Sequence, residues 1–362
     1  MIAGLKRAWD NLFGLGEAAV TVPPLDGSLR PNSKLDEARA RFPLENADCL
    51  VVVSGNVIVS SGNAIYAWKN NKRWRKREEY KSNIACIVTT TDGGLIVALT
   101  CGDIIIDGGK YDGRNYRLSE NIQCITALTV SDDYLFVANG SAINSAENWQ
   151  CDLMQRSASG SIWRIDLESG ESTQIAGNLA YPAGLILDGT SLIYSEAWKH
   201  RLVKIDAFGT GQSQILYGDM PGYPGRISRS TSGYWLAVFA PRSQLVEFVL
   251  RETAYCKRMI SEVPMAYWIA PKFRSGTSFY ESLQGGGVKH FGQLKPWAPT
   301  MSAGLCVKLN NTFQPDFSLH SRADGKTHGV TSIIEYGDDL FIAAHGDNVV
   351  VSIPLKNVGE SE

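Results

Sequence analysis

The stretch Asp48-Cys-Leu-Val-Val-Val-Ser-Gly-Asn-Val-Ile-Val59 consists of two short apolar runs on either side of a Ser-Gly turn. β-Branched residues that flank a turn signal are typical of two paired β-strands. Variants of this stretch recur along the chain, and they align without gaps on their second apolar run. The six strand pairs predicted in this way begin at Asp48, Cys86, Thr126, Ala183, Arg226 and Thr331.

Most of these pairs follow one another at intervals of about 40 residues, which is the length of one four-stranded propeller blade. A third strand is predicted after most pairs, at 64–68, 161–165, 201–205, 244–249 and 348–353. We therefore predict an all-β fold, a six-bladed β-propeller with four-stranded blades around a central channel. The chain ends soon after the third strand of the sixth blade, so an N-terminal strand from before Asp48 is expected to close the ring.

The repeat divides the chain into an N-terminal helix and extended arm at 1–35 and a single propeller domain at 36–362. The two longest intervals predict insertions at 141–160 and 251–302, and the second insertion contains a helical pattern at 252–263 and a Gly-rich loop. Two separate β domains are the alternative, which the even repeat and the absence of a linker disfavour.

Composition limits the classes of partner. The formal net charge is -2, and no apolar run approaches the roughly 18 residues of a membrane span. These features argue against nucleic acid and membrane partners, and the basic run at 69–79 fits a charged edge strand. The seven cysteines show no zinc-site spacing, so reduced thiols in a cytoplasmic protein fit best. No cofactor is expected, and the sequence does not predict the oligomeric state.

The first strand of each blade lines the channel of a propeller, so the residues at which these strands begin converge at one mouth. Asp48 and Arg226 are predicted to face each other there. In one interpretation Arg226 binds a substrate carboxylate and Asp48 acts as acid or base. In the other they form a structural ion pair. Thr126 and Thr331 are the remaining substrate-binding candidates in this ring.

Cys86 is predicted in the same ring, either as a nucleophile activated by the neighbouring Arg226 or as a small buried residue. His328 lies three residues before Thr331, and at the lip of the mouth it would transfer protons or cap the strand. His200 and His345 are expected in the outer layer.

Tyr181 and Tyr223 each precede a proline just before an inner strand. This position predicts that both rings rim the mouth of the channel. An aromatic rim suits an organic ligand with apolar bulk, although the same rings also serve to pack loops over the channel.

Three segments in the middle of the chain carry a family resemblance: Asn178-Leu-Ala-Tyr-Pro-Ala-Gly-Leu-Ile-Leu, Leu192-Ile-Tyr-Ser-Glu-Ala-Trp-Lys-His-Arg-Leu and Pro221-Gly-Tyr-Pro-Gly-Arg-Ile. They resemble strictosidine synthase and its bacterial relatives, a family similar to the gluconolactonases and paraoxonases. The resemblance covers most of the chain, and it implies a six-bladed propeller. It also implies either an enzyme of alkaloid condensation or a metal-dependent hydrolase of lactones and esters.

The sequence departs from both branches at the positions that the resemblance aligns. The metal-dependent relatives carry asparagine where this chain has Ala183, and aspartate and asparagine where it has Gly225 and Arg226. A methyl group offers no ligand atom and a guanidinium repels a cation, so no metal is predicted at this site. Strictosidine synthase carries its catalytic glutamate where this chain has Thr331, which cannot act as a base unaided.

These departures predict a metal-independent enzyme of the strictosidine synthase-like family. Asp48, His328 or Cys86 would perform hydrolase- or lyase-type acid–base chemistry on a small organic substrate at the channel mouth. One alternative is a non-catalytic propeller that binds a small ligand, because every inherited catalytic group is missing. Another is a lactone or ester hydrolase whose divalent-metal ligands have moved to neighbouring positions.

Overall fold

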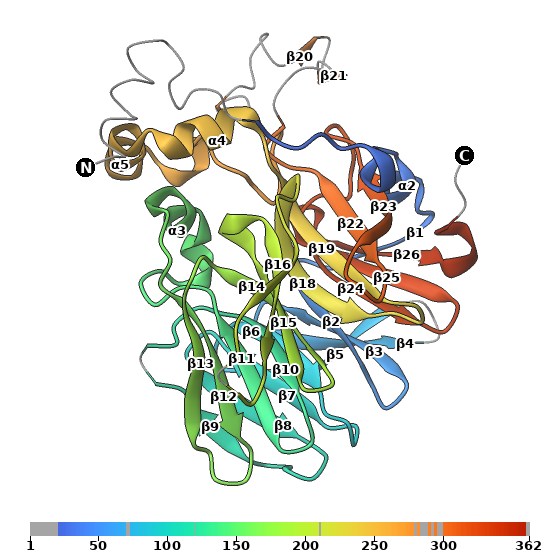
Figure 1. The fold of residues 1–362 in the computed structure, drawn as a ribbon. Helices are drawn as coiled ribbons and strands as arrows, with labels where there is room; N and C mark the ends of the chain where they lie inside the picture. The colour runs from blue at the N-terminus through green and yellow to red at the C-terminus, as the bar shows by residue number, and fades with distance from the viewer. Residues whose placement is uncertain are drawn as a thin grey trace.

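The computed structural model describes residues 21–69, 73–119, 121–209, 211–278, 281–282, 289–290, 293–294 and 300–359. Six sheets of four antiparallel strands are arranged as the blades of a ring (Figure 1), which confirms the predicted six-bladed β-propeller. The helix predicted at the start of the chain and most of the Gly-rich loop lie outside the described residues. In the remainder of the arm, the short helices η1 (Gly27–Leu29) and α2 (Lys34–Glu37) precede the propeller.

The blades follow the chain in order, and each runs from the channel outward. The first two are β2 (Ala47–Val53), β3 (Asn56–Ser61), β4 (Ala64–Lys69) and β5 (Arg73–Glu79), then β6 (Ile84–Thr89), β7 (Leu95–Leu99), β8 (Asp103–Asp107) and β9 (Asn115–Arg117). The next two are β10 (Ile125–Val130), β11 (Tyr134–Asn139), β12 (Gly160–Asp166) and β13 (Ser172–Leu179), then β14 (Pro182–Asp188), β15 (Ser191–Glu196), β16 (Arg201–Asp206) and β17 (Gln214–Tyr217). The fifth blade is β18 (Gly222–Arg229), β19 (Tyr234–Pro241), β22 (Gly304–Leu309) and β23 (Pro315–Ser321).

The sixth blade joins the two ends of the propeller. Its first three strands are β24 (Val330–Tyr336), β25 (Asp339–Ala344) and β26 (Val349–Pro354), followed by the short helix η6 (Leu355–Asn357). The fourth is β1 (Ala40–Pro43), which pairs antiparallel with β26 in the register Ala40 to Ser352. The predicted closure by a strand from before Asp48 is therefore confirmed, and the inner strands β2 and β24 contact each other across the closure.

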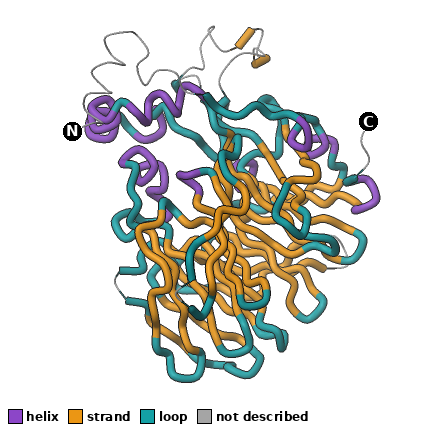
Figure 2. Tube along the Cα trace, in the orientation of Figure 1, coloured by secondary structure: helices purple, strands orange, loops and turns teal. Residues whose placement is uncertain are grey.

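The two insertions gather at one end of the ring, where Figure 2 shows most of the helices. The first insertion follows β11 and contains η2 (Ala146–Asn148) and α3 (Trp149–Gln155), and the fourth blade adds η3 (Ala197–Lys199). The second follows β19 and contains α4 (Gln244–Arg251), α5 (Thr253–Glu262), η4 (Met265–Tyr267) and the hairpin of β20 (Lys289–His290) and β21 (Gln293–Leu294). Helix α5 confirms the predicted helical stretch at 252–263.

The strand predicted at 244–249 is wrong, because these residues form helix α4. Ser243 caps the helix by accepting a hydrogen bond from the backbone N–H of Val246. Val246, Val249 and Leu250 are buried, with the spacing of one helix face. The third strand of the fifth blade is instead β22, so the insertion begins directly after the second strand. No helix in the described part of the chain is long and apolar enough to cross a membrane.

Candidate functional site

A β-bulge interrupts the first strand of every blade near its start, where the register with the second strand shifts. A bulge leaves a residue unpaired and turns its side chain away from the regular pleat. The residues at the six bulges converge at one mouth of the channel and line a cavity of about 520 Å³; they are Asp48, Ala85, Thr126, Ala183, Arg226 and Thr331. Five of these positions were predicted.

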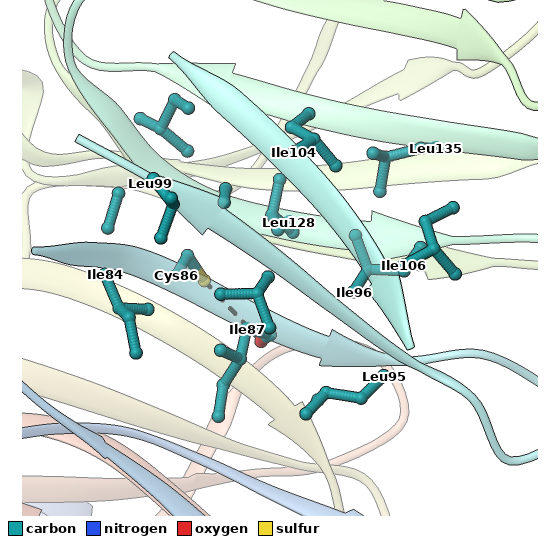
Figure 3. Packing of buried hydrophobic residues seen from close by; sticks show 14 of the residues in the cluster. Ile84, Cys86, Ile87, Leu95, Ile96, Leu99, Ile104, Ile106, Leu128 and Leu135 are labelled. Atoms are coloured by element: carbon teal, nitrogen blue, oxygen red, sulfur yellow. Dashed lines mark hydrogen bonds between the residues drawn. The ribbon is translucent and has the colours of Figure 1, made fainter. Parts of the chain in front are cut away.

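Cys86 was placed in this ring wrongly, since Ala85 holds the position. Thr90 pairs with Gly94 beyond the ends of β6 and β7, which leaves a three-residue turn. The first blade has a two-residue turn at this place, so the gapless alignment slipped by one. The Cys86 thiol points instead into the core between blades (Figure 3), where it lies 3.6 Å from the thiol of Cys49. This contact lowers the pKa of the Cys86 thiol against the effect of burial. A nucleophile buried in this way does not face the cavity.

Arg226 forms the floor of the cavity, and all five of its N–H donors have acceptors. Nη1 and Nη2 each donate to one carboxylate oxygen of Asp48 at 2.8 Å. The remaining donors reach backbone carbonyls of three other blades, those of Thr126 at 3.2 Å, Thr331 at 3.4 Å and Ala85 at 3.1 Å. A single side chain of the fifth blade thus bonds to the first, second, third and sixth blades. Its hydrogen-bonding capacity is used within the protein.

The Asp48 carboxylate is held in its charged form. Burial would raise its pKa, but the bidentate contact with Arg226 outweighs burial and lowers the pKa below the ordinary value. Burial likewise opposes the charge of Arg226, and Asp48 raises the pKa of the guanidinium in return. The side chains of Arg226 and Asp48 are only 17% and 24% exposed. Of the two interpretations that the sequence left open, this largely buried bidentate contact favours the structural ion pair.

The two ring threonines also bond within the protein. The Thr126 hydroxyl donates to the carbonyl of Pro182 at 2.5 Å, and the Thr331 hydroxyl donates to the carbonyl of Asp48 at 2.8 Å. Each bond links one blade to its neighbour. Both residues line the cavity as predicted, but their hydroxyl protons are engaged with the backbone.

His328 does not lie at the lip of the mouth, and this placement was wrong. It is fully buried beside the fifth blade, where Nδ1 contacts the hydroxyl of Ser302 at 2.8 Å and Nε2 contacts the carbonyl of Arg322 at 2.7 Å. Burial and the nearby Arg274 lower its pKa. A carbonyl only accepts, so Nε2 carries the proton and Nδ1 accepts from Ser302.

Tyr223 was also predicted at the rim, and the structure buries it completely. Its hydroxyl lies 3.4 Å from Glu247 of α4, and its ring packs edge-on against His200 at 4.7 Å. Glu247 also forms ion pairs with His200 and Arg242. Tyr223 therefore belongs to a buried polar cluster that fastens α4 to the propeller.

His345 is a cavity residue that the sequence reasoning assigned to the outer layer. It lies in η5 (His345–Asp347), directly after β25, and it lines the cavity. Its Nδ1 is 3.3 Å from the carbonyl of Ala47, so Nδ1 carries the proton and Nε2 the lone pair. Its ring packs against Phe273 at 5.0 Å. An imidazole with a free lone pair on Nε2 can accept a proton.

Aromatic side chains form one wall of the cavity, which we call the aromatic wall: Trp149, Tyr181, Phe239 and Phe273. Tyr181 was predicted at this rim, and it adopts a φ of 58°, in the left-handed region that non-glycine residues seldom occupy. It stacks on Trp198 with a centroid distance of 4.3 Å. A Cβ atom added at Gly140 would lie 2.9 Å from the Tyr181 ring, so the absence of a side chain there makes room for it.

A buried carboxylate supports this wall from behind. Asp152 of α3 is 1% exposed, and its oxygens accept from the Trp198 indole at 2.8 Å and from the Asn144 amide at 3.0 Å. It thereby ties the insertion that carries Trp149 to the fourth blade that carries Tyr181. The lining also includes polar side chains, those of Asn46, Asn83, Thr100 and His345.

The residues of the ring do not suit a divalent cation. Asp48 is its one carboxylate, and both oxygens accept from Arg226. Ala183 and Ala85 offer no side-chain donor atom, and the fixed guanidinium occupies the centre. Among the described residues there is no group of three or more His, Cys, Asp or Glu side chains that could hold a metal ion.

No family model matches the chain. Two curated proteins are similar over a segment, the adipocyte plasma membrane-associated proteins of Danio rerio and Salmo salar. Each is 28% identical over 131 residues, which is 32% of this chain and 31% of the relative. The chain thus spans about a third of the length of the curated relatives it matches.

Solved structures share the fold along most of both chains. A luciferin-regenerating enzyme has a TM-score of 0.53 at 13% identity, covering 88% of this chain and 93% of its own. The calcium-binding protein regucalcin of Agrobacterium tumefaciens has a TM-score of 0.52 at 10% identity, covering 87% and 93%. A candidate gluconolactonase has a TM-score of 0.50 at 10% identity, covering 86% and 89%. The chain therefore has the six-bladed propeller fold that these proteins share.

Proposed function

We propose that this chain binds a small organic molecule in the cavity at the mouth of its central channel. The observation that carries the proposal is the contrast between the floor and the walls. The floor is closed, because Arg226 has an acceptor for every N–H donor. The walls remain open, and they combine aromatic rings with amide, hydroxyl and imidazole groups. A concave site with apolar walls and a few polar groups suits a small organic ligand.

Metal-independent catalysis of the hydrolase type is a second candidate, and His345 favours it. The Ala47 carbonyl fixes the proton on Nδ1, so Nε2 is available to take a proton from water or from the substrate. The propellers with the same fold include an enzyme that regenerates luciferin and a candidate gluconolactonase. Asp48 is a poor base, because Arg226 outweighs the effect of burial and lowers the pKa of its carboxyl. The strictosidine synthase-like assignment would rest on activity with an amine and an aldehyde.

Binding is tested with N-phenyl-1-naphthylamine, a neutral probe whose fluorescence rises when it leaves water. We expect saturable binding by the wild type and its loss in Thr100→Trp, since Thr100 is exposed at the cavity and a larger side chain would fill the mouth. Thr312→Trp is the matched control, because Thr312 is exposed on a turn outside the cavity. Equal binding by all three proteins would refute the site.

Catalysis is tested on a panel of lactones and aryl esters in the presence of a chelator. We expect turnover that His345→Gln reduces by roughly 100-fold, the lower end of what a general base contributes. Turnover that disappears in chelator would contradict a metal-independent mechanism. Turnover that is unchanged in His345→Gln would exclude His345 as the base.

A further inference from the structure

The charge balance of the cavity leaves one carboxylate without a counter-charge. Besides the Tyr181 phenol, four ionisable side chains among the described residues line the cavity: Asp48, Glu147, Arg226 and His345. Asp48 and Arg226 neutralise each other through two hydrogen bonds. Glu147 of η2 is exposed and has no ion-pair partner among the described residues. As far as the described residues show, the cavity therefore offers a negative charge and no free fixed cation.

Glu147 lies two residues before Trp149, so the carboxylate is next to the aromatic wall along the chain, and both residues line the same cavity. The rings of the wall also contact one another. Trp149 lies 5.5 Å from Phe239 and 5.3 Å from Phe273, and these two phenylalanines are 5.9 Å apart. Aromatic faces carry partial negative charge and attract cations within about 6 Å of the ring.

The protein's own cations do not use these rings. In the described part of the chain, cation–π contacts occur on Tyr111, Tyr134, Phe208, Tyr234 and Trp235, all outside the cavity. Among the described residues, no lysine or arginine lies over the rings of the aromatic wall. Their capacity to stabilise a positive charge is therefore available to a ligand.

The floor of the cavity is already engaged with a cation of the protein. The carbonyls of Thr126, Thr331 and Ala85 and the oxygens of Asp48 accept from Arg226, whose guanidinium charge repels a second cation, so an organic cation is expected against the walls. A quaternary ammonium has no N–H donor and carries its charge on methyl groups that pack against apolar surface. It is also weakly hydrated, so its transfer into an aromatic cavity costs less.

We propose that the cavity takes a ligand with a quaternary ammonium group, which lies against the aromatic wall and is balanced by the charge of Glu147. The proposal rests on the proposed small-molecule function and names the ligand class of the same cavity. Aromatic recognition of a fully methylated nitrogen is a known use of the cation–π interaction. The polar side chains of the lining would then contact the remainder of the ligand.

Choline and its neutral carbon isostere, 3,3-dimethylbutan-1-ol, test this proposal because they differ chiefly in charge. We expect choline to bind at least roughly tenfold more tightly in calorimetric titrations of the full chain, the ratio that a partly desolvated cation–π contact provides. Glu147→Gln should weaken choline binding several-fold and leave the isostere unchanged. Glu171→Gln, an exposed glutamate on a turn away from the cavity, is the matched control.

Equal affinity for choline and the isostere, or choline affinity that Glu147→Gln leaves unchanged, would overturn the proposal. In that case, binding of N-phenyl-1-naphthylamine that Thr100→Trp abolishes would show that the small-molecule site stands with another ligand class. Failure of the naphthylamine, choline and the isostere alike would reject the small-molecule function and the ligand class together. Glu147 is on the surface, so its substitution is expected to leave the fold intact.

Discussion

The Asp48–Arg226 pair gives the most direct test of whether the floor of the cavity is structural or takes part in chemistry. We consider Arg226→Met, Asp48→Leu and the double variant that combines them. Arg226→Met leaves the Asp48 carboxylate with no counter-charge and releases three backbone carbonyls. The loss of one partner of a buried ion pair costs about 3–5 kcal/mol.

The double variant should recover most of this loss. When both partners become apolar, no uncompensated charge remains, and such exchanges are often neutral or stabilising. Three carbonyls still lose a donor, but both side chains face the cavity and are partly exposed, so water can replace the lost bonds. We expect the double variant to lose no more than about 2 kcal/mol, less than either single variant.

Urea unfolding followed by far-ultraviolet circular dichroism measures these free energies, provided that the slopes with denaturant agree among the four proteins. Binding of the neutral naphthylamine probe is measured on the same proteins. A structural floor predicts that the double variant binds the probe within a few-fold of the wild type. Losses that simply add, or Arg226→Met within about 0.5 kcal/mol of the wild type, would refute the structural interpretation.

Three further predictions concern acid stability and packing. Burial would raise the pKa of Glu247, but His200 and Arg242 outweigh burial and lower it to about 2. The charged carboxylate therefore stabilises the fold above pH 4.5, its ordinary pKa, and roughly 3 kcal/mol of the free energy of unfolding is lost as pH falls towards 2. Glu247→Gln should flatten that part of a pH–stability curve, and an unchanged slope would contradict the assignment. Burial lowers the pKa of His320 to about 4, so stability should also decline as pH falls from 6.5 to 4, and His320→Asn should remove this decline from the same urea titrations. A Cβ at Gly184 would lie 2.0 Å from the carbonyl of Gly225, so Gly184→Ala should lower the melting temperature by several degrees. Gly218→Ala is the matched control, because Gly218 is exposed and a Cβ there would have no neighbour closer than 3.6 Å. Equal melting temperatures of the two variants would contradict the packing.

The sequence was sufficient to predict the blades, because each begins with the same hairpin of two apolar runs around a turn. It was insufficient to predict an element whose pattern fits both a strand and a helix. The segment at 244–249 is apolar and rich in β-branched residues, as a strand would be, but Val246, Val249 and Leu250 also follow the helical period. These residues form the helix, because its apolar face is buried when it packs against the propeller.

The sequence predicted five of the six positions that form the ring, but it did not predict which of their side chains are free to contact a ligand. The bulge positions follow from the repeat, whereas the capture of every Arg226 donor by carbonyls of other blades depends on the closed ring. The exception is His345, which a simple geometric argument would have found. Because the hairpins are antiparallel, the end of each second strand lies at the mouth where the first begins, and Gly62, Thr100 and His345 occupy such positions.

The bulges explain why the floor is closed. Each bulge frees a backbone carbonyl from the ladder, and those of Ala85, Thr126 and Thr331 point toward Arg226, where they meet the carboxylate of Asp48. Converging carbonyl and carboxylate oxygens are the donors that a hard cation takes in proteins. Here a guanidinium fills that role, and because it belongs to the chain it cannot dissociate or exchange a ligand with substrate. The charge at the floor thus joins the blades, and in the function that we propose, ligand recognition falls to Glu147, His345 and the aromatic wall.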